Sequence, residues 1–184
     1  LISTPGLIPD PSYVGVFSSF TREVEEFVDR KIATISSTIS TRDAYFGPSA
    51  FVNLTHSAQL GITSSDVSFA APLSFDARIE QGSIYVRDMF KLYSYENLLY
   101  IMNLTGNEIK KYLEYSYGLW LNTMKSEDDN LLLFRKDESG EVIVHNRGRA
   151  LLQSSFYNFD SAAGIRYQVD ASKPVGERVK IISM

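Results

Sequence analysis

An apolar run followed directly by a helix start constrains this chain more than any other feature of its sequence. Residues 98–104 read LLYIMNL, and their length and content predict a buried strand. The next four residues place Thr105 at a helix cap and Glu108 three positions later, which is the capping-box pattern. Apolar residues such as Ile109 and Leu113 then recur at helical spacing. The sequence thus predicts a buried strand joined without a loop to an amphipathic helix.

Helical and strand-like segments alternate through the rest of the chain. Apolar residues from Phe20 to Ile35 recur at helical spacing with acidic residues between them, which predicts an amphipathic helix of about four turns. A second helix is predicted from Pro48 to Leu60, ended by Gly61. The remaining predicted elements are a strand at 66–71, a loop at 72–82, a short helix at 84–92 and hairpin strands at 131–134, 142–144, 165–169 and 178–182. This interleaved order indicates an α+β fold with a mixed sheet and packed helices.

Composition limits the classes of function. The chain has 184 residues, of which 44% are hydrophobic, and this suits one domain with a sizeable core. Its net charge of −4 argues against a broad electrostatic grip on a nucleic-acid polymer. A single mononucleotide remains a suitable partner, because it needs only local donors and a stacking surface. No apolar run is long enough to cross a membrane.

Metal and thiol chemistry lack their usual ligands in this sequence. There is no cysteine, which excludes disulfides, thiol catalysis and Cys-based zinc sites. The two histidines, His56 and His145, are far apart in the sequence, and no cluster of His and carboxylate ligands at close spacing occurs. We therefore expect no metal or other cofactor in this chain, and a hydrolytic metal centre would have to lie outside it.

Three stretches of the chain follow the pattern of one family in order. They read DVSFAAPLSFDARIEQGSI at 66–84, VRDMFKLYSYENLLYIMNLTGNEIKKYLEYS at 86–116, and YNFD followed by GIRYQVD between 157 and 170. The first two give a strand, a small-residue loop, a short helix, an aromatic–x–Asn turn and an LTG-x-E helix start. Together they resemble the C-terminal domain of the exported 5'-nucleotidase family. The third resembles the branch that cleaves 2',3'-cyclic nucleotides and 3'-nucleotides.

The resemblance implies an organisation and a function. Residues 18–184 would form a substrate-recognition domain truncated at its C-terminus, and residues 1–17 an interdomain linker. Family members carry an N-terminal metallophosphoesterase domain with two divalent metal ions, which would be the partner that performs the hydrolysis. The implied location is periplasmic or at the cell surface, and the chain alone is expected to be inactive. The alternative is a non-catalytic nucleotide- or ligand-binding module.

The resemblance also assigns two residues to base recognition. Tyr95 occupies the position of a base-stacking aromatic, and a core tyrosine is the alternative. Asn97 offers an amide donor and acceptor to a base or ribose edge, or else it caps a turn. Glu96 stands between them, where the family most often has Pro or Gly.

Charged residues near the 72–78 loop complete the predicted site. The simple 5'-nucleotidase branch has a phosphate-facing Arg where this chain has Asp76, which could instead accept a hydrogen bond from a ribose hydroxyl. Arg78 is either a ligand contact or a solvated charge. Arg42 could meet a phosphate bidentately, or pair with Asp43 or another acid.

Overall fold

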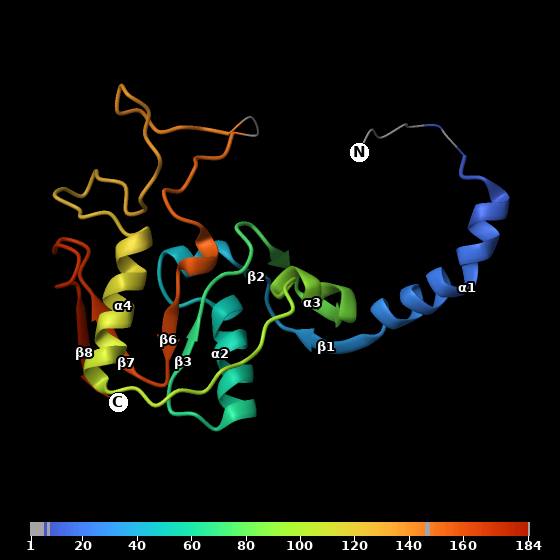
Figure 1. The fold of residues 1–184 in the computed structure, drawn as a ribbon, viewed down its shortest axis with the longest axis horizontal. Helices are drawn as coiled ribbons and strands as arrows, with labels where there is room; N and C mark the ends of the chain where they lie inside the picture. The colour runs from blue at the N-terminus through green and yellow to red at the C-terminus, as the bar shows by residue number, and fades with distance from the viewer. Residues whose placement is uncertain (1–5, 7, 146–147, 184) are drawn as a thin grey trace.

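Helices and short strand pairs alternate along the chain, and the computed structural model describes residues 6, 8–145 and 148–183 of it (Figure 1). The helices are α1 (Pro11–Val28), α2 (Ala50–Thr63), α3 (Val86–Leu92) and α4 (Gly106–Trp120), with the 3-10 helices η1 (Arg42–Tyr45) and η2 (Phe156–Asn158). The strands are β1 (Lys31–Ile35), β2 (Ile39–Ser40), β3 (Ser68–Ala70), β4 (Arg78–Ile79), β5 (Gly82–Tyr85), β6 (Ser161–Ala163), β7 (Arg166–Val169) and β8 (Val179–Ser183). The predicted α+β class is confirmed.

The strands pair two by two, and every pair is antiparallel. β1 pairs with β5, β2 with β4, β3 with β6, and β7 with β8. One mixed sheet was expected, but the described part of the chain forms separate two-stranded sheets. The strands have two to five residues, at or below the usual length of strands in globular proteins.

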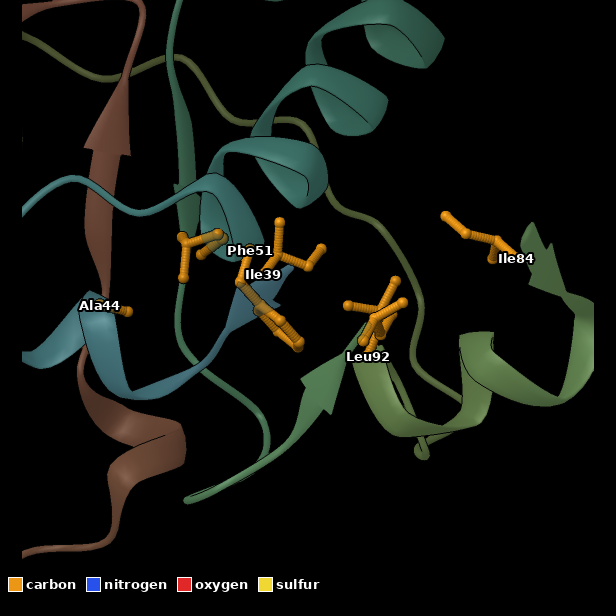
Figure 2. Packing of buried hydrophobic residues seen from close by; sticks show 8 residues of the cluster. Ile39, Ala44, Phe51, Ile84 and Leu92 are labelled. Carbon is orange, nitrogen blue, oxygen red and sulfur yellow. The ribbon is translucent and has the colours of Figure 1, made fainter. Parts of the chain in front are cut away.

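Three hydrophobic clusters hold these elements together. Figure 2 shows the first, in which Ile39 of β2, Phe51 of α2 and Leu92 of α3 come together. The second surrounds Trp120 at the end of α4, whose ring lies 5.1 Å from the ring of Phe159. The third packs the inner face of α4 on β8 and its neighbours. Helix α4 thus contributes to two of the three clusters.

A reciprocal clamp joins α4 to the start of β8. The buried carboxylate of Glu114 accepts hydrogen bonds from the backbone N–H groups of Gly176, Arg178 and Val179 at 3.0, 3.1 and 2.6 Å. The buried guanidinium of Arg178 in turn donates to the carbonyl of Leu121 at 2.6 Å, just past the C-terminus of α4. Each partner therefore satisfies backbone groups that the other element leaves unpaired.

Further hydrogen bonds complete the burial of Arg178. Its side chain also donates to the carbonyl of Lys173 at 2.9 Å and to the hydroxyl of Thr123 at 2.5 Å. Burial lowers the pKa of Arg178, and the Glu114 carboxylate opposes that shift. Both charges stay buried because each has a hydrogen-bonded set of partners.

The start of α4 follows the sequence prediction. Thr105 Oγ1 accepts from the N–H of Glu108 at 3.3 Å, and Glu108 Oε2 accepts from the N–H of Thr105 at 2.7 Å, so the capping box is confirmed. Ile109, Leu113 and Ser116 are buried on the inner face of the helix as expected. The predicted hairpin at 165–182 is confirmed by the pairing of β7 with β8.

The first helix is shifted toward the N-terminus relative to the prediction. It begins at Pro11, where the side chain of Asp10 accepts from the N–H of Ser12 at 2.8 Å, and it ends at Val28. Residues 31–35, which were expected in this helix, form β1 and pair with β5. The apolar spacing continued through Ile35, but the local sequence KIATI is rich in β-branched residues and gains an edge partner.

The apolar run at 98–104 departs most from the prediction. It is extended, but it belongs to no strand pair, and Leu98 and Met102 are 78% and 70% exposed. In Figure 1 it crosses from α3 to α4 as a plain ribbon. The expectation of a buried strand is wrong here, because apolar content favours burial but does not supply a neighbouring strand.

The clamp gives a prediction for stability. Glu114→Gln replaces an acceptor oxygen with an amide NH2 that faces backbone donors, so at least one buried N–H loses its partner. We expect a loss of about 2–4 kcal/mol in the free energy of unfolding. Urea denaturation followed by circular dichroism measures this loss.

Glu177→Gln is the matched control, because it removes the same charge from an exposed position in the same turn. It should change stability by less than about 0.5 kcal/mol. Equal effects of the two substitutions would contradict a specific role for the Glu114 carboxylate.

Candidate functional site

The register of β2 against β4 brings Arg42 and Asp76 together. Ile39 pairs with Ile79 and Ser40 with Arg78 in this ladder. The same register continues one step past the strands, because Thr41 donates its N–H to the carbonyl of Ala77 at 3.0 Å, and its side-chain Oγ1 accepts from the N–H of Ala77 at 2.9 Å.

The next step of that register places Arg42 opposite Asp76. Arg42 Nε lies 3.3 Å from Asp76 Oδ1, and both side chains are exposed. An exposed pair of this kind contributes about 1 kcal/mol or less to stability, so both charges remain accessible to a ligand.

Arg78 lies on the same ladder but takes a different partner. Its Nε is 2.6 Å from Glu80 Oε1, and Thr38 donates its hydroxyl to Glu80 Oε2 at 2.8 Å. Arg78 and Glu80 thus lie side by side at the end of β4. The structure thus pairs two of the predicted residues, Arg42 and Asp76, and holds Arg78 beside them in a separate ion pair.

An aromatic group supports the loop that carries Asp76. The ring of Phe75 lies 5.6 Å from the ring of Tyr45 and 6.1 Å from that of Phe156. Tyr45 is buried in the cluster around Trp120. The packing of Phe75 on other aromatic rings and the hydrogen bonds between Ala77 and Thr41 therefore hold the loop in place.

Arg149 is a residue beside this loop that the sequence did not indicate. Its guanidinium carbon lies 4.4 Å from the centroid of the Phe75 ring, which is a cation–π distance. No local pattern marks Arg149, because the contact joins residues 75 and 149. The guanidinium consequently stands beside the same loop as Asp76.

Three short extended segments position Arg149, and we call them the meander: residues 134–136, 142–144 and 150–152. Three backbone bonds close a ring in it: Arg135 donates to Leu151, Leu151 to Ile143, and Ile143 to Arg135, at 2.8–2.9 Å. The meander includes the hairpin predicted around 137–140, as isolated bridges rather than full strands. Its root is bonded to the end of α4, where Leu133 donates to the carbonyl of Trp120 at 2.8 Å.

Tyr95 and Asn97 follow α3 in the chain. Leu92, the last residue of α3, packs in one cluster with Ile79 of β4, so the segment begins beside that strand. Tyr95 is 51% exposed and is not a core tyrosine. Asn97 donates from Nδ2 to the hydroxyl of Tyr93 at 2.9 Å, which leaves its carbonyl oxygen available.

A cavity of about 570 Å³ lies between α2, α4 and β7. His56 and Ser161 line it, together with Tyr45 and Trp120. His56 is 3% exposed, and its ring nitrogens lie 2.9 Å from Ser68 Oγ and 3.3 Å from Ser161 Oγ.

The hydrogen bonds of His56 indicate a structural role. Ser68 donates to Gln59 Oε1 and so accepts from His56 Nδ1–H. Nε2 faces the hydroxyl of Ser161, which also lies 3.4 Å from the carbonyl of Ala70. The histidine thereby fastens α2 to both β3 and β6. Burial lowers its pKa from 6.5 to about 4, which keeps the ring neutral and makes it a weak base.

None of the helices described is both long and apolar enough to cross a membrane. In residues 6, 8–145 and 148–183, no three His, Cys, Asp or Glu side chains are grouped so that they could hold a metal ion.

Comparison with known proteins decides the family. The family model described as "5'-nucleotidase, C-terminal domain" matches residues 31–184. The chain belongs to this family. The match begins at the first residue of β1, directly after α1 and the short turn that follows it.

Two curated proteins are similar in sequence to part of this chain. The trifunctional nucleotide phosphoesterase protein YfkN of Bacillus subtilis is 31% identical over 116 residues, covering 60% of this chain and 7% of its own length. A 2',3'-cyclic-nucleotide 2'-phosphodiesterase/3'-nucleotidase of Salmonella typhimurium is 30% identical over 107 residues, covering 56% of this chain and 13% of its own. The chain therefore spans a small part of the length of these nucleotide hydrolases.

A solved structure confirms the fold. A chain from Staphylococcus aureus, described as a 5'-nucleotidase in complex with alpha-ketoglutarate, aligns with a TM-score of 0.67 at 18% identity. The alignment covers 97% of this chain and 32% of that one. At this identity the likeness is informative about the fold alone.

The neutral, buried His56 gives a prediction for pH dependence. Its pKa is about 4 in the folded chain and near 6.5 when unfolded, so the unfolded state binds more protons between these values. Stability should therefore fall as pH decreases below about 6.5, by at most about 1.4 kcal/mol per pH unit. Urea denaturation between about pH 7 and pH 5 measures this slope, above the range in which carboxylates of ordinary pKa titrate.

His56→Gln serves as the test variant, because it retains hydrogen-bonding groups and cannot titrate. The slope over this range should be reduced by up to one proton. His145→Gln is the control and should leave the slope of the parent chain unchanged. An unchanged slope in His56→Gln would show that another group is responsible.

Proposed function

We propose that this chain is the nucleotide-recognition domain of an exported bacterial 5'-nucleotidase or 2',3'-cyclic-nucleotide phosphodiesterase. The observation that carries the proposal is the family match over residues 31–184, together with relatives named as nucleotide phosphoesterases. In this proposal the domain binds base and ribose and presents the phosphoester to a separate catalytic domain. Such binding accelerates hydrolysis by orienting the substrate.

The exposed aromatic at Tyr95 supports base recognition. Its side chain is half exposed two residues before Asn97, and the segment follows α3, whose last residue Leu92 shares a cluster with Ile79 of β4. Stacking on an aromatic face tolerates every base, since all bases have a π-face. This suits a domain that accepts several nucleotides.

The catalytic metals belong to the other domain in this proposal. Two divalent ions there would activate water for attack on phosphorus. The residues of this chain would supply binding and orientation only. Export to the periplasm or the cell surface is part of the same proposal and would be tested by locating the full-length protein in cell fractions.

A non-catalytic ligand-binding module is the second candidate. It is favoured by Glu96 beside the stacking position and by Asp76 in the loop, both of which depart from the resembled pattern. The gene that encodes the chain distinguishes the two. Metal-ligand motifs in an adjoining phosphoesterase domain would favour the enzyme.

Tyr95→Ala should weaken nucleotide binding. We expect the chain to bind AMP and 2'-AMP with a Kd of about 1 mM or weaker, and to lose about 1–3 kcal/mol on removal of the ring, or about fivefold or more in Kd. NMR titration measures both, and Tyr95 and Asn97 should shift first. Tyr115→Ala, which removes an even more exposed tyrosine on α4, is the control. Shifts confined to another face would reject the site.

The isolated chain should not hydrolyse nucleotides. Its described residues lack a cluster of metal ligands, and the proposal assigns the reaction to another domain. Phosphate release from AMP and from 2',3'-cyclic AMP, assayed with added Mn²⁺, Mg²⁺ or Zn²⁺, should equal the buffer blank. Metal-dependent release by this chain that survives repurification would contradict the assignment.

A further inference from the structure

Helix α1 presents a row of large apolar side chains to solvent. None of its 18 residues is buried. Tyr13, Phe17, Phe20, Val24 and Phe27, which we call the apolar stripe, are each 43–67% exposed. In Figure 1 the helix extends away from the other elements, and its C-terminal end is the part that lies near them. A contiguous exposed patch of this kind is typical of an interaction surface.

The spacing of the apolar stripe is that of a coiled-coil seam. Its members follow one another at intervals of 4, 3, 4 and 3 residues, which are the a and d positions of a heptad repeat. A helix that packs on the core of a domain usually has a wider apolar face, whereas a strict a and d pattern fits a second helix. A second copy of this chain supplies a helix with the same pattern.

The charges of α1 favour an antiparallel partner. Glu23, Glu25 and Glu26 lie in the C-terminal half of the helix, with Arg22 as its one basic residue. Residues 11–21 carry no charged side chain. A parallel pair would bring the two acidic halves together. An antiparallel pair places each acidic half against an uncharged half, and it also opposes the two helix dipoles.

The attachment of α1 to the domain agrees with this orientation. Asp29, directly after the helix, forms an ion pair with Arg87 of α3, and Arg30 accepts from the N–H of Val86 at 3.1 Å. The domain therefore stands at the C-terminal end of α1. An 18-residue helix is about 27 Å long, so an antiparallel pair keeps the two domains at opposite ends of the seam.

The area of the apolar stripe indicates a weak interaction. A fully covered aromatic side chain buries about 150–250 Å², and the four aromatic residues of the stripe are about half exposed. Two helices therefore cover at most roughly 700–1,100 Å² of aromatic surface, which is at the low end for specific interfaces. We expect a reversible dimer with a Kd of roughly 100 µM.

We propose that α1 is a self-association site, at which two copies of this chain pair antiparallel along the apolar stripe. Phe20 lies at the centre of the stripe and faces Phe20 of the partner subunit. The contact is isologous, since the same patch serves both copies. This inference goes beyond the proposed function, because it concerns the assembly of the chain and involves no nucleotide.

Sedimentation velocity of the chain tests the association. Between about 10 µM and about 1 mM, the parent chain should change reversibly from monomer to dimer. Phe20→Glu places two carboxylates face to face and should raise the Kd at least about tenfold. Ser19→Glu is the matched control, because it adds the same charge at an exposed neighbouring position outside the stripe, and its Kd should stay within about twofold of the parent value.

A single spin label tests the orientation, because the chain has no cysteine of its own. Ser12→Cys carrying a nitroxide is mixed with the ¹⁵N-labelled parent chain at high concentration. An antiparallel pair should broaden the amide signals of Val28 and Asp29 in the parent chain. Broadening confined to residues around Ser12 would overturn the antiparallel arrangement.

The remaining outcomes are equally decisive. A chain that stays monomeric at about 1 mM overturns the inference, and so does a dimer that Phe20→Glu leaves intact. If the full-length polypeptide is monomeric while this chain dimerises, another part of that polypeptide covers the stripe, and self-association is overturned as the role of α1. AMP titration of the Phe20→Glu chain tests the proposed function separately, because α1 has no part in the nucleotide site.

Discussion

The exchange of backbone partners between Glu114 and Arg178 is the constraint on which much of this structure depends. Helix α4 ends in the Trp120 cluster and packs its inner face on β8, so the position of β8 relative to the helix fixes both clusters. A buried carboxylate that accepts three backbone N–H groups tolerates little displacement. Fixing the end of α4 also fixes the root of the meander, because Leu133 is bonded to Trp120. The clamp therefore also helps to position Arg149, whose guanidinium lies over the ring of Phe75.

The alignment of the short strands β2 and β4 determines where the charged residues of the candidate site lie. Two residue pairs of β2 and β4 set the alignment, and the Thr41–Ala77 bonds carry it two steps further to Arg42 and Asp76. A shift of one residue would exchange the faces of the ladder and separate those charges. The burial of Thr41 and the aromatic contact at Phe75 oppose such a shift. The position of the charged groups is thus a property of the core beneath them.

The sequence predicted those elements whose causes are local. The capping box at Thr105 needs only two residues three apart, and the hairpin of β7 and β8 needs only two short runs around a turn. Strand partners could not be predicted in the same way. The run at 98–104 has the composition of a buried strand, yet it lies exposed, because burial depends on a neighbour that composition does not specify.

The candidate site also combines features with local causes and contacts between residues distant in the sequence. The motif around Tyr95 and Asn97 was visible as a pattern, and the exposure of Tyr95 agrees with a contact residue. Arg149 was invisible, because its meeting with Phe75 joins residues that are distant in the sequence. Arg42 and Asp76 were each singled out, but only the register shows that they face one another.

Helix α1 has a consequence of a different kind. It has 18 residues, none of them buried, and Tyr13, Phe17, Phe20, Val24 and Phe27 form an exposed apolar stripe along it. An isolated helix of this length is only marginally stable in water, and most helices in proteins owe their stability to a covered face. The helical content of α1 is therefore thermodynamically coupled to whatever shields that stripe. Shielding of the stripe would then raise the far-ultraviolet helical signal of the chain above the constant contribution of the folded domain.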